Sequence, residues 1–155
     1  MATPSLLPPE RPPPPERSPQ GIKALILEGD RVVESTDFDE VIEALTAEKP
    51  IWVELDQRTK FGERLLEHLK IHPLAQEDVW NDLGLPKIED FDDYLQLVMH
   101  GVREEDVAGN EIPIHLAELD MIIGKTWLVT HAHDEKVCAV SPVRVEVLRS
   151  PRLMK

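Results

Sequence analysis

The sequence predicts an α/β fold in which helices cover a mixed β-sheet. In some segments apolar residues alternate with polar ones, and in others they recur at helical spacing. The segments follow the order β-β-α-β-α-α-β-β-β, with helices between strands in the first half and paired strands in the second. The length of 155 residues suits one domain with a hydrophobic core and is short for two.

Residues 1–20 differ in composition from the rest of the chain. They hold eight of the 14 prolines and few apolar side chains beyond Leu6 and Leu7. We therefore expect a disordered or polyproline-like leader, followed by one folded domain over residues 21–155. Docking of the proline run into an aromatic groove of a partner protein is a second interpretation of this leader.

The first half of the domain predicts a hairpin, a helix, a strand and a second helix. Residues 22–35 form the hairpin, with its turn at Gly29-Asp30. Thr36 and Asp39 resemble a capping box at the start of the first helix, whose buried face is Phe38, Val41, Ile42 and Leu45. Residues 50–56 form the strand, and residues 60–71 form the second helix.

A third helix starts at Pro73, a residue favoured in the first helical position. It carries two adjacent carboxylates, Glu77 and Asp78, which we expect to be held in place by the packing of Leu74, Val79 and Trp80. Carboxylates are the ligands that magnesium and calcium prefer, and magnesium accepts one or two of them while keeping most of its waters. The alternative interpretation is an ordinary solvated helix face.

The second half predicts strands. Residues 94–102 read as a strand with Leu95, Leu97 and Met99 on one face. Residues 115–133 read as a hairpin that turns at Gly124-Lys125, with Leu119, Met121 and Ile123 facing one way. Residues 142–149 are compatible with a short helix or a strand.

The charge balance limits the possible partners. The chain has 30 acidic and 17 basic residues and a formal net charge of −13, so its surface repels nucleic acid and favours cations and basic protein surfaces.

A single cysteine, Cys138, excludes an internal disulfide and fits a reducing compartment. No uncharged stretch exceeds about ten residues, whereas a membrane helix needs about 20, and no secretory signal is apparent. We expect this piece of chain to be soluble.

Motifs for catalysis are absent from the sequence, so we expect no enzyme. There is no Gly-x-Ser-x-Gly elbow, no activating motif beside Cys138 and no glycine-rich phosphate loop. His131 and His133 lie two apart on a strand and so share a face, with Asp134 and Glu135 nearby. The two imidazoles, with these acids nearby, form a candidate zinc site, which leaves a zinc-dependent enzyme as one alternative. The other interpretation is that both are ordinary surface histidines near the end of a strand.

Three linked segments closely resemble the cytoplasmic domain of the CorA family of magnesium and cobalt transporters. They read HPLAQEDVWN from residue 72, LPKIEDFDDYLQLVMH from residue 85 and ELDMIIGKTWLVTHAH from residue 118. That family has a His-Pro-Leu-Ala-x-Glu-Asp helix, a Pro-Lys-(Ile/Val)-Glu strand ending in Asp-Tyr-Leu, and a hairpin with Gly-Lys-x-x-(Leu/Val)-x-Thr-x-His. The resemblance covers about residues 22–150, with matches at Pro86, Lys87, Ile88, Glu89, Asp93, Tyr94, Leu95, Gly124, Lys125, Thr130 and His131. Glu54 stands where the family usually has Asp.

The resemblance implies an αβα sandwich with a mixed central sheet, on the cytoplasmic side of a cell membrane. It also implies a homopentamer in which Mg2+ bound between neighbouring domains holds a pore closed. Asp78 would be a ligand of that regulatory site, and Glu77 would contribute to a second site nearby. The family's stalk helices and its two membrane helices with a Gly-Met-Asn loop would follow Lys155, so the membrane is reached only through them. The isolated domain is then expected to bind metal weakly and is compatible with a monomer.

Two further alternatives stay open at this stage. The ZntB branch shares the architecture and moves zinc, so Zn2+ or Co2+ could replace Mg2+ as the bound ion. The intact His-Pro-Leu-Ala-x-Glu-Asp and Pro-Lys segments favour the magnesium and cobalt branch. The second alternative is a freestanding acidic interaction module that keeps the fold without transport.

Overall fold

The computed structural model describes residues 17–82, 85–104, 114–133 and 140–155. These residues form one sheet of seven strands in the order β2-β1-β3-β7-β6-β5-β4. The strands are β1 Ile22–Glu28, β2 Arg31–Ser35, β3 Ile51–Leu55, β4 Lys87–Asp90, β5 Leu95–Glu104, β6 Ile114–Ile123 and β7 Trp127–Ala132. The helices are α1 Phe38–Thr46, α2 Lys60–His68, α3 Pro73–Trp80, α4 Val140–Arg149 and the short 3-10 helix Pro151–Met154.

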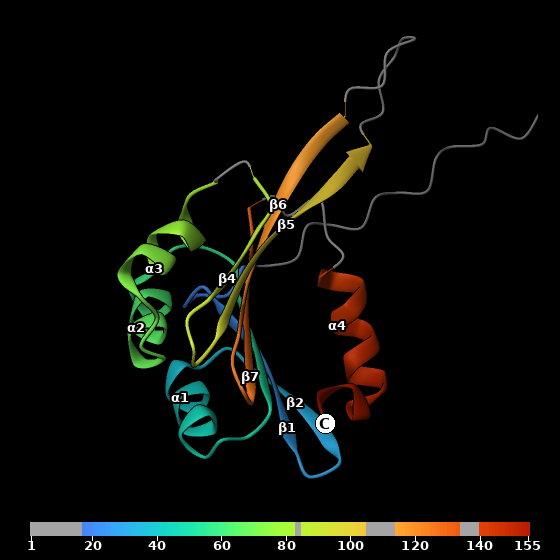
Figure 1. Ribbon diagram of the computed structural model, residues 1–155. Helices are drawn as coiled ribbons and strands as arrows, with labels where there is room; N and C mark the ends of the chain where they lie inside the picture. Colours follow the sequence, from blue (N-terminus) through green and yellow to red (C-terminus); the bar gives the residue numbers. More distant parts are fainter. Residues whose placement is uncertain (1–16, 83–84, 105–113, 134–139) are drawn as a thin grey trace, which may run out of the picture.

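The sheet is mixed, as predicted. Neighbouring strands run antiparallel except for β3 and β7, which are parallel. Helices α1, α2 and α3 cover one face, and α4 lies on the other face (Figure 1). The expected α/β fold with an αβα arrangement is therefore confirmed, and the last uncertain element, residues 142–149, lies within a helix.

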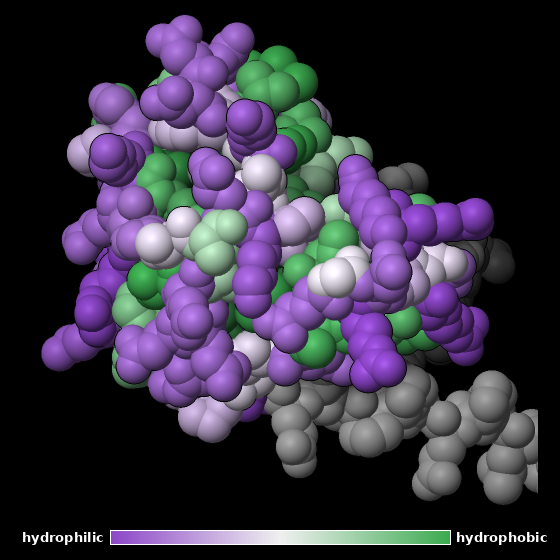
Figure 2. Space-filling model, turned by 90° about the horizontal axis from the view of Figure 1, so that it is seen from below, coloured by the Kyte–Doolittle hydropathy of each residue, from purple (hydrophilic) through white to green (hydrophobic). Residues whose placement is uncertain are grey.

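The two helical layers give the protein two hydrophobic clusters. The larger lies between the sheet and α1–α3 and includes Val41, Val53, Leu65 and Val79. The smaller joins Leu25 and Trp52 to Val140 and Val147 of α4. Strand β3 contributes to both, since it is central in the sheet and is covered on both faces. Outside these layers, hydrophilic side chains cover most of the face shown in Figure 2, with smaller hydrophobic areas between them.

The start of the fold differs from the prediction in two details. Helix α1 is capped by Asp37 and not by Thr36, because Asp37 directly precedes the helix in extended conformation and accepts hydrogen bonds from the amides of Asp39 and Glu40. Contacts also begin before residue 21. The Ser18 amide donates to Asp56 Oδ2 at 2.7 Å, and the Gln20 side chain accepts from the Phe38 amide at 2.7 Å. The predicted leader up to residue 16 lies outside the described residues.

Several apolar residues of strands β5 and β6 lie on the face of the sheet that carries α4. Leu95 and Met99 do share a face, as predicted, but they are 40% and 46% exposed on the α4 side. The alternate residues Gln96 and Val98 are buried, and they lie on the side of α1–α3 with Ile122. Polar side chains therefore lie beneath α3, and this arrangement produces the site described next.

Candidate metal centres

Helix α3 is fixed by its first turn and by one apolar face. The Nδ1 atom of His72 accepts from the Leu74 amide at 3.2 Å, and the His72 amide donates to the Tyr94 hydroxyl at 2.9 Å. Ala75 and Val79, one turn apart, are buried against the core. The prediction that Leu74 packs was wrong: it is 64% exposed, because it lies about 100° around the helix from Ala75.

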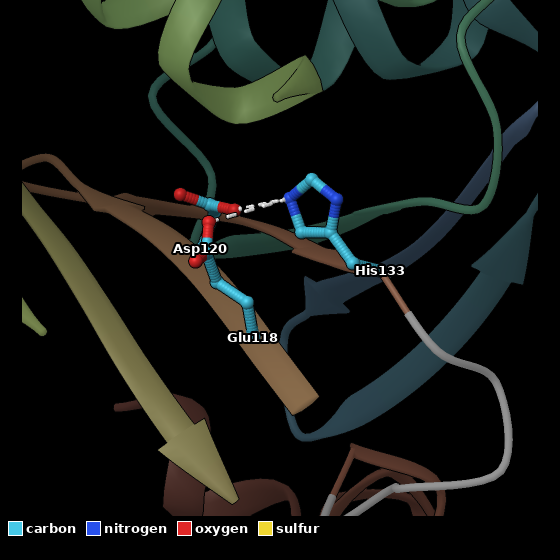
Figure 3. Close-up of side chains that lie close together, drawn as sticks. All are labelled: Glu118, Asp120 and His133. Atoms are coloured by element: carbon cyan, nitrogen blue, oxygen red, sulfur yellow. Dashed lines mark hydrogen bonds and ion pairs between the residues drawn. The ribbon is translucent and has the colours of Figure 1, made fainter. Parts of the chain in front are cut away.

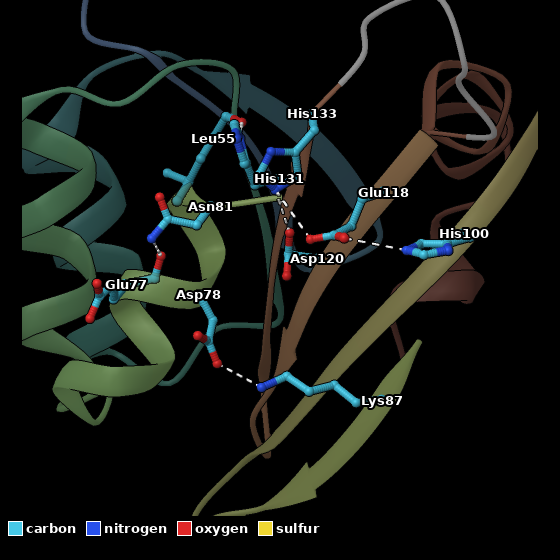
Figure 4. A network of polar contacts seen from close by, with 10 residues as sticks. All are labelled: Leu55, Glu77, Asp78, Asn81, Lys87, His100, Glu118, Asp120, His131 and His133. Carbon is cyan, nitrogen blue, oxygen red and sulfur yellow. Dashed lines mark hydrogen bonds and ion pairs between the residues drawn. The ribbon is translucent and has the colours of Figure 1, made fainter. Parts of the chain in front are cut away.

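The two predicted ligands on α3 point in different directions. The Asp78 side chain is half-buried and faces β4, where its Oδ2 atom lies 2.6 Å from Lys87 Nζ (Figure 4). Glu77 is exposed and points away from Asp78 (Figure 4). The side chains of adjacent helical residues are rotated by about 100° about the helix axis. The two carboxylates therefore do not lie close enough together to bind one ion.

Lys87 is held between two carboxylates, since its Nζ atom also lies 2.8 Å from Glu89 Oε2. Partial burial disfavours the charged ammonium, but the hydrogen bonds to Asp78 and Glu89 outweigh it and raise the pKa of Lys87 above its usual value. A cation that binds Asp78 therefore competes with a positive charge already present.

A second cluster lies on the buried face of β6 and β7. It consists of Glu118, Asp120 and His133, whose possible ligand atoms all lie within 4.8 Å of one another (Figure 3). The strand register explains the cluster: Glu118 and Asp120 are two apart on β6, and the His133 amide continues the ladder by donating to the Glu118 carbonyl at 3.1 Å. We call these three residues the β6–β7 cluster.

Within the β6–β7 cluster, the imidazole bridges two carboxylates. His133 Nε2 lies 2.7 Å from Asp120 Oδ2 and 3.7 Å from Glu118 Oε1. On the far side, Glu118 Oε2 lies 3.3 Å from His100 Nε2 of β5 (Figure 4). The side chains of Glu118 and Asp120 are each 1% exposed, so water screens these charges poorly.

Burial and charge shift the protonation equilibria of the cluster. Burial raises the pKa of Asp120, against the hydrogen bond and charge of His133, and the carboxylates of Glu118 and Asp78 raise it further. The hydrogen bond to Asp120 raises the pKa of His133 despite burial, and nearby carboxylates, including that of Asp82, add to this effect. Asp78 on α3 and Asp82 just after that helix therefore contribute negative charge to the region of the cluster.

His131 does not join the cluster, although its ring centroid is 4.7 Å from that of His133. Its Nδ1 atom donates to the Leu55 carbonyl at 2.8 Å, and its ring packs edge-on against Trp80. Burial lowers the pKa of His131, so the neutral imidazole is favoured. His131 is thus a structural residue that ties β7 to the end of β3.

Zinc binding by residues 131–135 stays a prediction, but the structure changes the set of neighbouring side chains. The structure brings His133 together with carboxylates of β6, while Asp134 and Glu135 lie outside the described residues. The sequence did contain a signal that we missed, because Glu118 and Asp120 stand at i and i+2 in a strand and must share one face. Their pairing with His133 needs the register of β6 against β7.

The family model of CorA-like Mg2+ transporter proteins matches residues 47–152. The chain belongs to this CorA family. It is 28% identical over 92 residues to the metal ion transporter candidate YfjQ of Bacillus subtilis. The aligned segment covers 59% of this chain and 26% of YfjQ. It is 32% identical over 71 residues to the cobalt/magnesium transport protein CorA of Thermotoga maritima. That alignment covers 44% of this chain and 20% of the Thermotoga protein. The chain thus spans about a quarter or less of these curated relatives.

Several solved structures share the fold. The full-length CmaX protein superposes with a TM-score of 0.66 at 15% identity, over 84% of this chain and 40% of CmaX. The soluble domain of CorA from Methanocaldococcus jannaschii superposes with a TM-score of 0.57 at 13% identity, over 86% of this chain and 48% of that domain. The ZntB cytoplasmic domain of Vibrio parahaemolyticus superposes with a TM-score of 0.55 at 14% identity, over 82% of this chain and 48% of that domain. In the part of the CorA-like chain that the structure describes, no helix has the length and apolar character needed to cross a membrane.

Proposed function

We propose that this chain is the cytosolic sensing domain of a CorA-like transporter for Mg2+ or Co2+. In this proposal, Mg2+ bound at Asp78 between the subunits of a homopentamer holds the pore closed. Membership of the CorA family, over residues 47–152, is the observation that carries the proposal. The Asp78 carboxylate fits the ion, because Mg2+ takes one or two carboxylates and keeps several waters.

The position of Asp78 supports a regulatory role. Helix α3 is anchored through Ala75 and Val79, so the carboxylate has a defined position at the edge of the fold. Lys87 neutralises part of its charge, which lowers its affinity for cations and suits a sensor that must release its ion when the cytosolic concentration falls. Glu77, exposed and pointing elsewhere, is assigned to a separate, weaker site.

The gating mechanism follows from charge. A domain with a net charge of −13 repels its neighbours when they approach. A divalent ion that bridges two domains offsets this repulsion only in the closed arrangement, so it shifts the population towards the closed state. Loss of the ion lets the domains separate and the pore open. This domain acts by binding and not by catalysis.

Transport by the complete protein that carries this domain tests the proposal. The variant Asp78→Asn keeps the shape of the side chain and removes its charge, so the cytosolic Mg2+ concentration that half-inhibits transport should rise several-fold. Glu67→Gln makes the same chemical change at an exposed position of α2 and should leave that concentration unchanged. Equal inhibition of the wild type and Asp78→Asn would refute the sensing role of Asp78.

The transported ion needs a separate measurement. Fold similarity does not separate the CorA and ZntB branches, because the TM-scores of 0.57 and 0.55 come at 13% and 14% identity. Uptake of Mg2+, Co2+ and Zn2+ by the complete protein should show Mg2+ or Co2+ transport. Uptake of Zn2+ alone would place the protein in the ZntB branch, and uptake of none would favour the interaction module.

A further inference from the structure

We propose that the β6–β7 cluster is a binding site for a first-row transition-metal dication such as Zn2+, separate from the Mg2+ site at Asp78. Its ligands are the Glu118 carboxylate, the Asp120 carboxylate and Nε2 of His133. None of these residues lies on α3, so this site does not depend on the proposed function.

The geometry already approaches that of a metal site. Zinc holds nitrogen and carboxylate oxygen at about 2.0–2.2 Å, which places the ligand atoms of a tetrahedral site about 3.3 Å apart. The observed separations from His133 Nε2 are 2.7 Å to Asp120 Oδ2 and 3.7 Å to Glu118 Oε1. Metal binding therefore requires that the contact to Asp120 opens by about 0.6 Å and that the contact to Glu118 closes by about 0.4 Å, which side-chain rotations can supply.

The protein leaves the buried Asp120 carboxylate only partly satisfied, because Oδ2 meets His133 while the other oxygen points away from that ring (Figure 3). Asp120 is 1% exposed, and its Oδ1 atom finds no hydrogen-bond donor among the described residues. Burying a carboxylate oxygen without a partner is costly, and buried charges are usually paired or coordinate a metal. On the same face, both amide atoms of the buried Gln96 side chain also lack a partner in the described structure.

The donor set selects the class of ion. Imidazole nitrogen suits zinc, copper, nickel and iron, whereas magnesium and calcium take oxygen ligands almost alone. When the ion binds, the proton on His133 Nε2 leaves for solvent and the nitrogen lone pair takes its place on the metal. The two carboxylates then match the charge of the dication, and a water molecule completes the coordination.

His100 is a positioning residue for this site. Its Nε2 atom lies 3.3 Å from Glu118 Oε2, and such a contact orients the carboxylate so that Oε1 faces His133. Hydrogen bonds of this kind to ligating groups commonly tune metal affinity by about 10- to 100-fold. The cluster thus has both inner ligands and an outer support.

Zinc titration of the metal-stripped 155-residue chain, followed with a chromophoric chelator, tests the proposal. We expect one Zn2+ per chain, and millimolar Mg2+ should not displace it. Asp120→Asn and His133→Gln should each weaken binding by more than about tenfold. His68→Gln, at an exposed position of α2, should bind Zn2+ as the wild type does. Zn2+ affinity that is the same in all three variants would overturn the proposal.

A measurement on the wild-type chain covers the case in which Asp120→Asn or His133→Gln does not fold. Nitrogen-15 spectra of the histidine side chains report which ring nitrogens bind the ion. On addition of one equivalent of Zn2+, the Nε2 signal of His133 should move to the position of a metal-bound nitrogen, while that of His68 should not. Shifts confined to exposed histidines such as His68 and His72, or no shift at all, would overturn the proposal.

Discussion

The ammonium of Lys87 lies 2.6 Å from Oδ2 of Asp78, so two residues nine positions apart are joined across α3 and β4. Both belong to the segments that resemble the CorA family. The contact makes Lys87 an internal competitor for any cation that binds Asp78, and it leads to the first prediction.

Removing the Lys87 charge should strengthen metal binding at Asp78. A partly exposed ion pair is worth about 0.2–1 kcal/mol, so Lys87→Met should lower the Mg2+ concentration that half-inhibits transport by about 1.4- to fivefold. The control Lys125→Met removes the same charge from the exposed turn between β6 and β7. Similar shifts for both variants would mean that net charge, and not the contact with Asp78, sets the sensitivity.

The hydrogen bond from Trp52 Nε1 to Thr130 Oγ1, 2.9 Å long, joins β3 to β7 in a buried environment. Thr130→Val keeps the shape of the side chain but leaves the indole N–H unpaired, which should lower the free energy of unfolding by about 1–3 kcal/mol. Chemical denaturation measures the loss. Thr46→Val, at an exposed helix position, should cost less. A loss at Thr130 no greater than at Thr46 would contradict the prediction.

Gly124 contacts the ring of Trp127 across the β6–β7 turn. A Cβ atom at this position would lie 2.1 Å from Cε2 of Trp127, so the ring must move. We expect Gly124→Ala to lower the free energy of unfolding by about 1–3 kcal/mol. The clash disappears when the ring is removed, so the same change in a Trp127→Ala background should cost far less. Equal costs in the two backgrounds would show that the ring is not the cause.

Tyr94 supports the start of α3. Its buried hydroxyl accepts the hydrogen bond of the His72 amide at 2.9 Å, so Tyr94→Phe leaves this N–H without its partner. We expect a loss of about 1 kcal/mol in unfolding free energy and faster hydrogen exchange of the His72 amide. Phe91, which stacks on Tyr94 at 4.9 Å between ring centroids, offers a control. Phe91→Leu should alter stability without selectively exposing that amide, and unchanged exchange in Tyr94→Phe would contradict the assigned role.

Local patterns were sufficient to predict most elements but not their exact contacts. Hydrophobic periodicity predicted β1, β2, α1, β3 and α2, because the period of side chains along a helix or strand depends on the backbone alone. The cap of α1 moved from Thr36 to Asp37, since residues of both types can cap a helix and only the backbone conformation selects between them. Leu74 was misplaced because an apolar side chain in a short helix does not by itself indicate which side is covered.

The sequence by itself determined the α/β class, the order of the elements from β1 to α3, the relation to CorA-like proteins and the position of Asp78 on a helix. The tertiary structure decided which face of β5 and β6 is buried, because alternation groups residues by face without saying which layer covers that face. It also decided that Asp78 meets Lys87 and that Asp120 meets His133. These contacts join different elements, and their distances follow from strand register and helix packing, which no local pattern of residues contains.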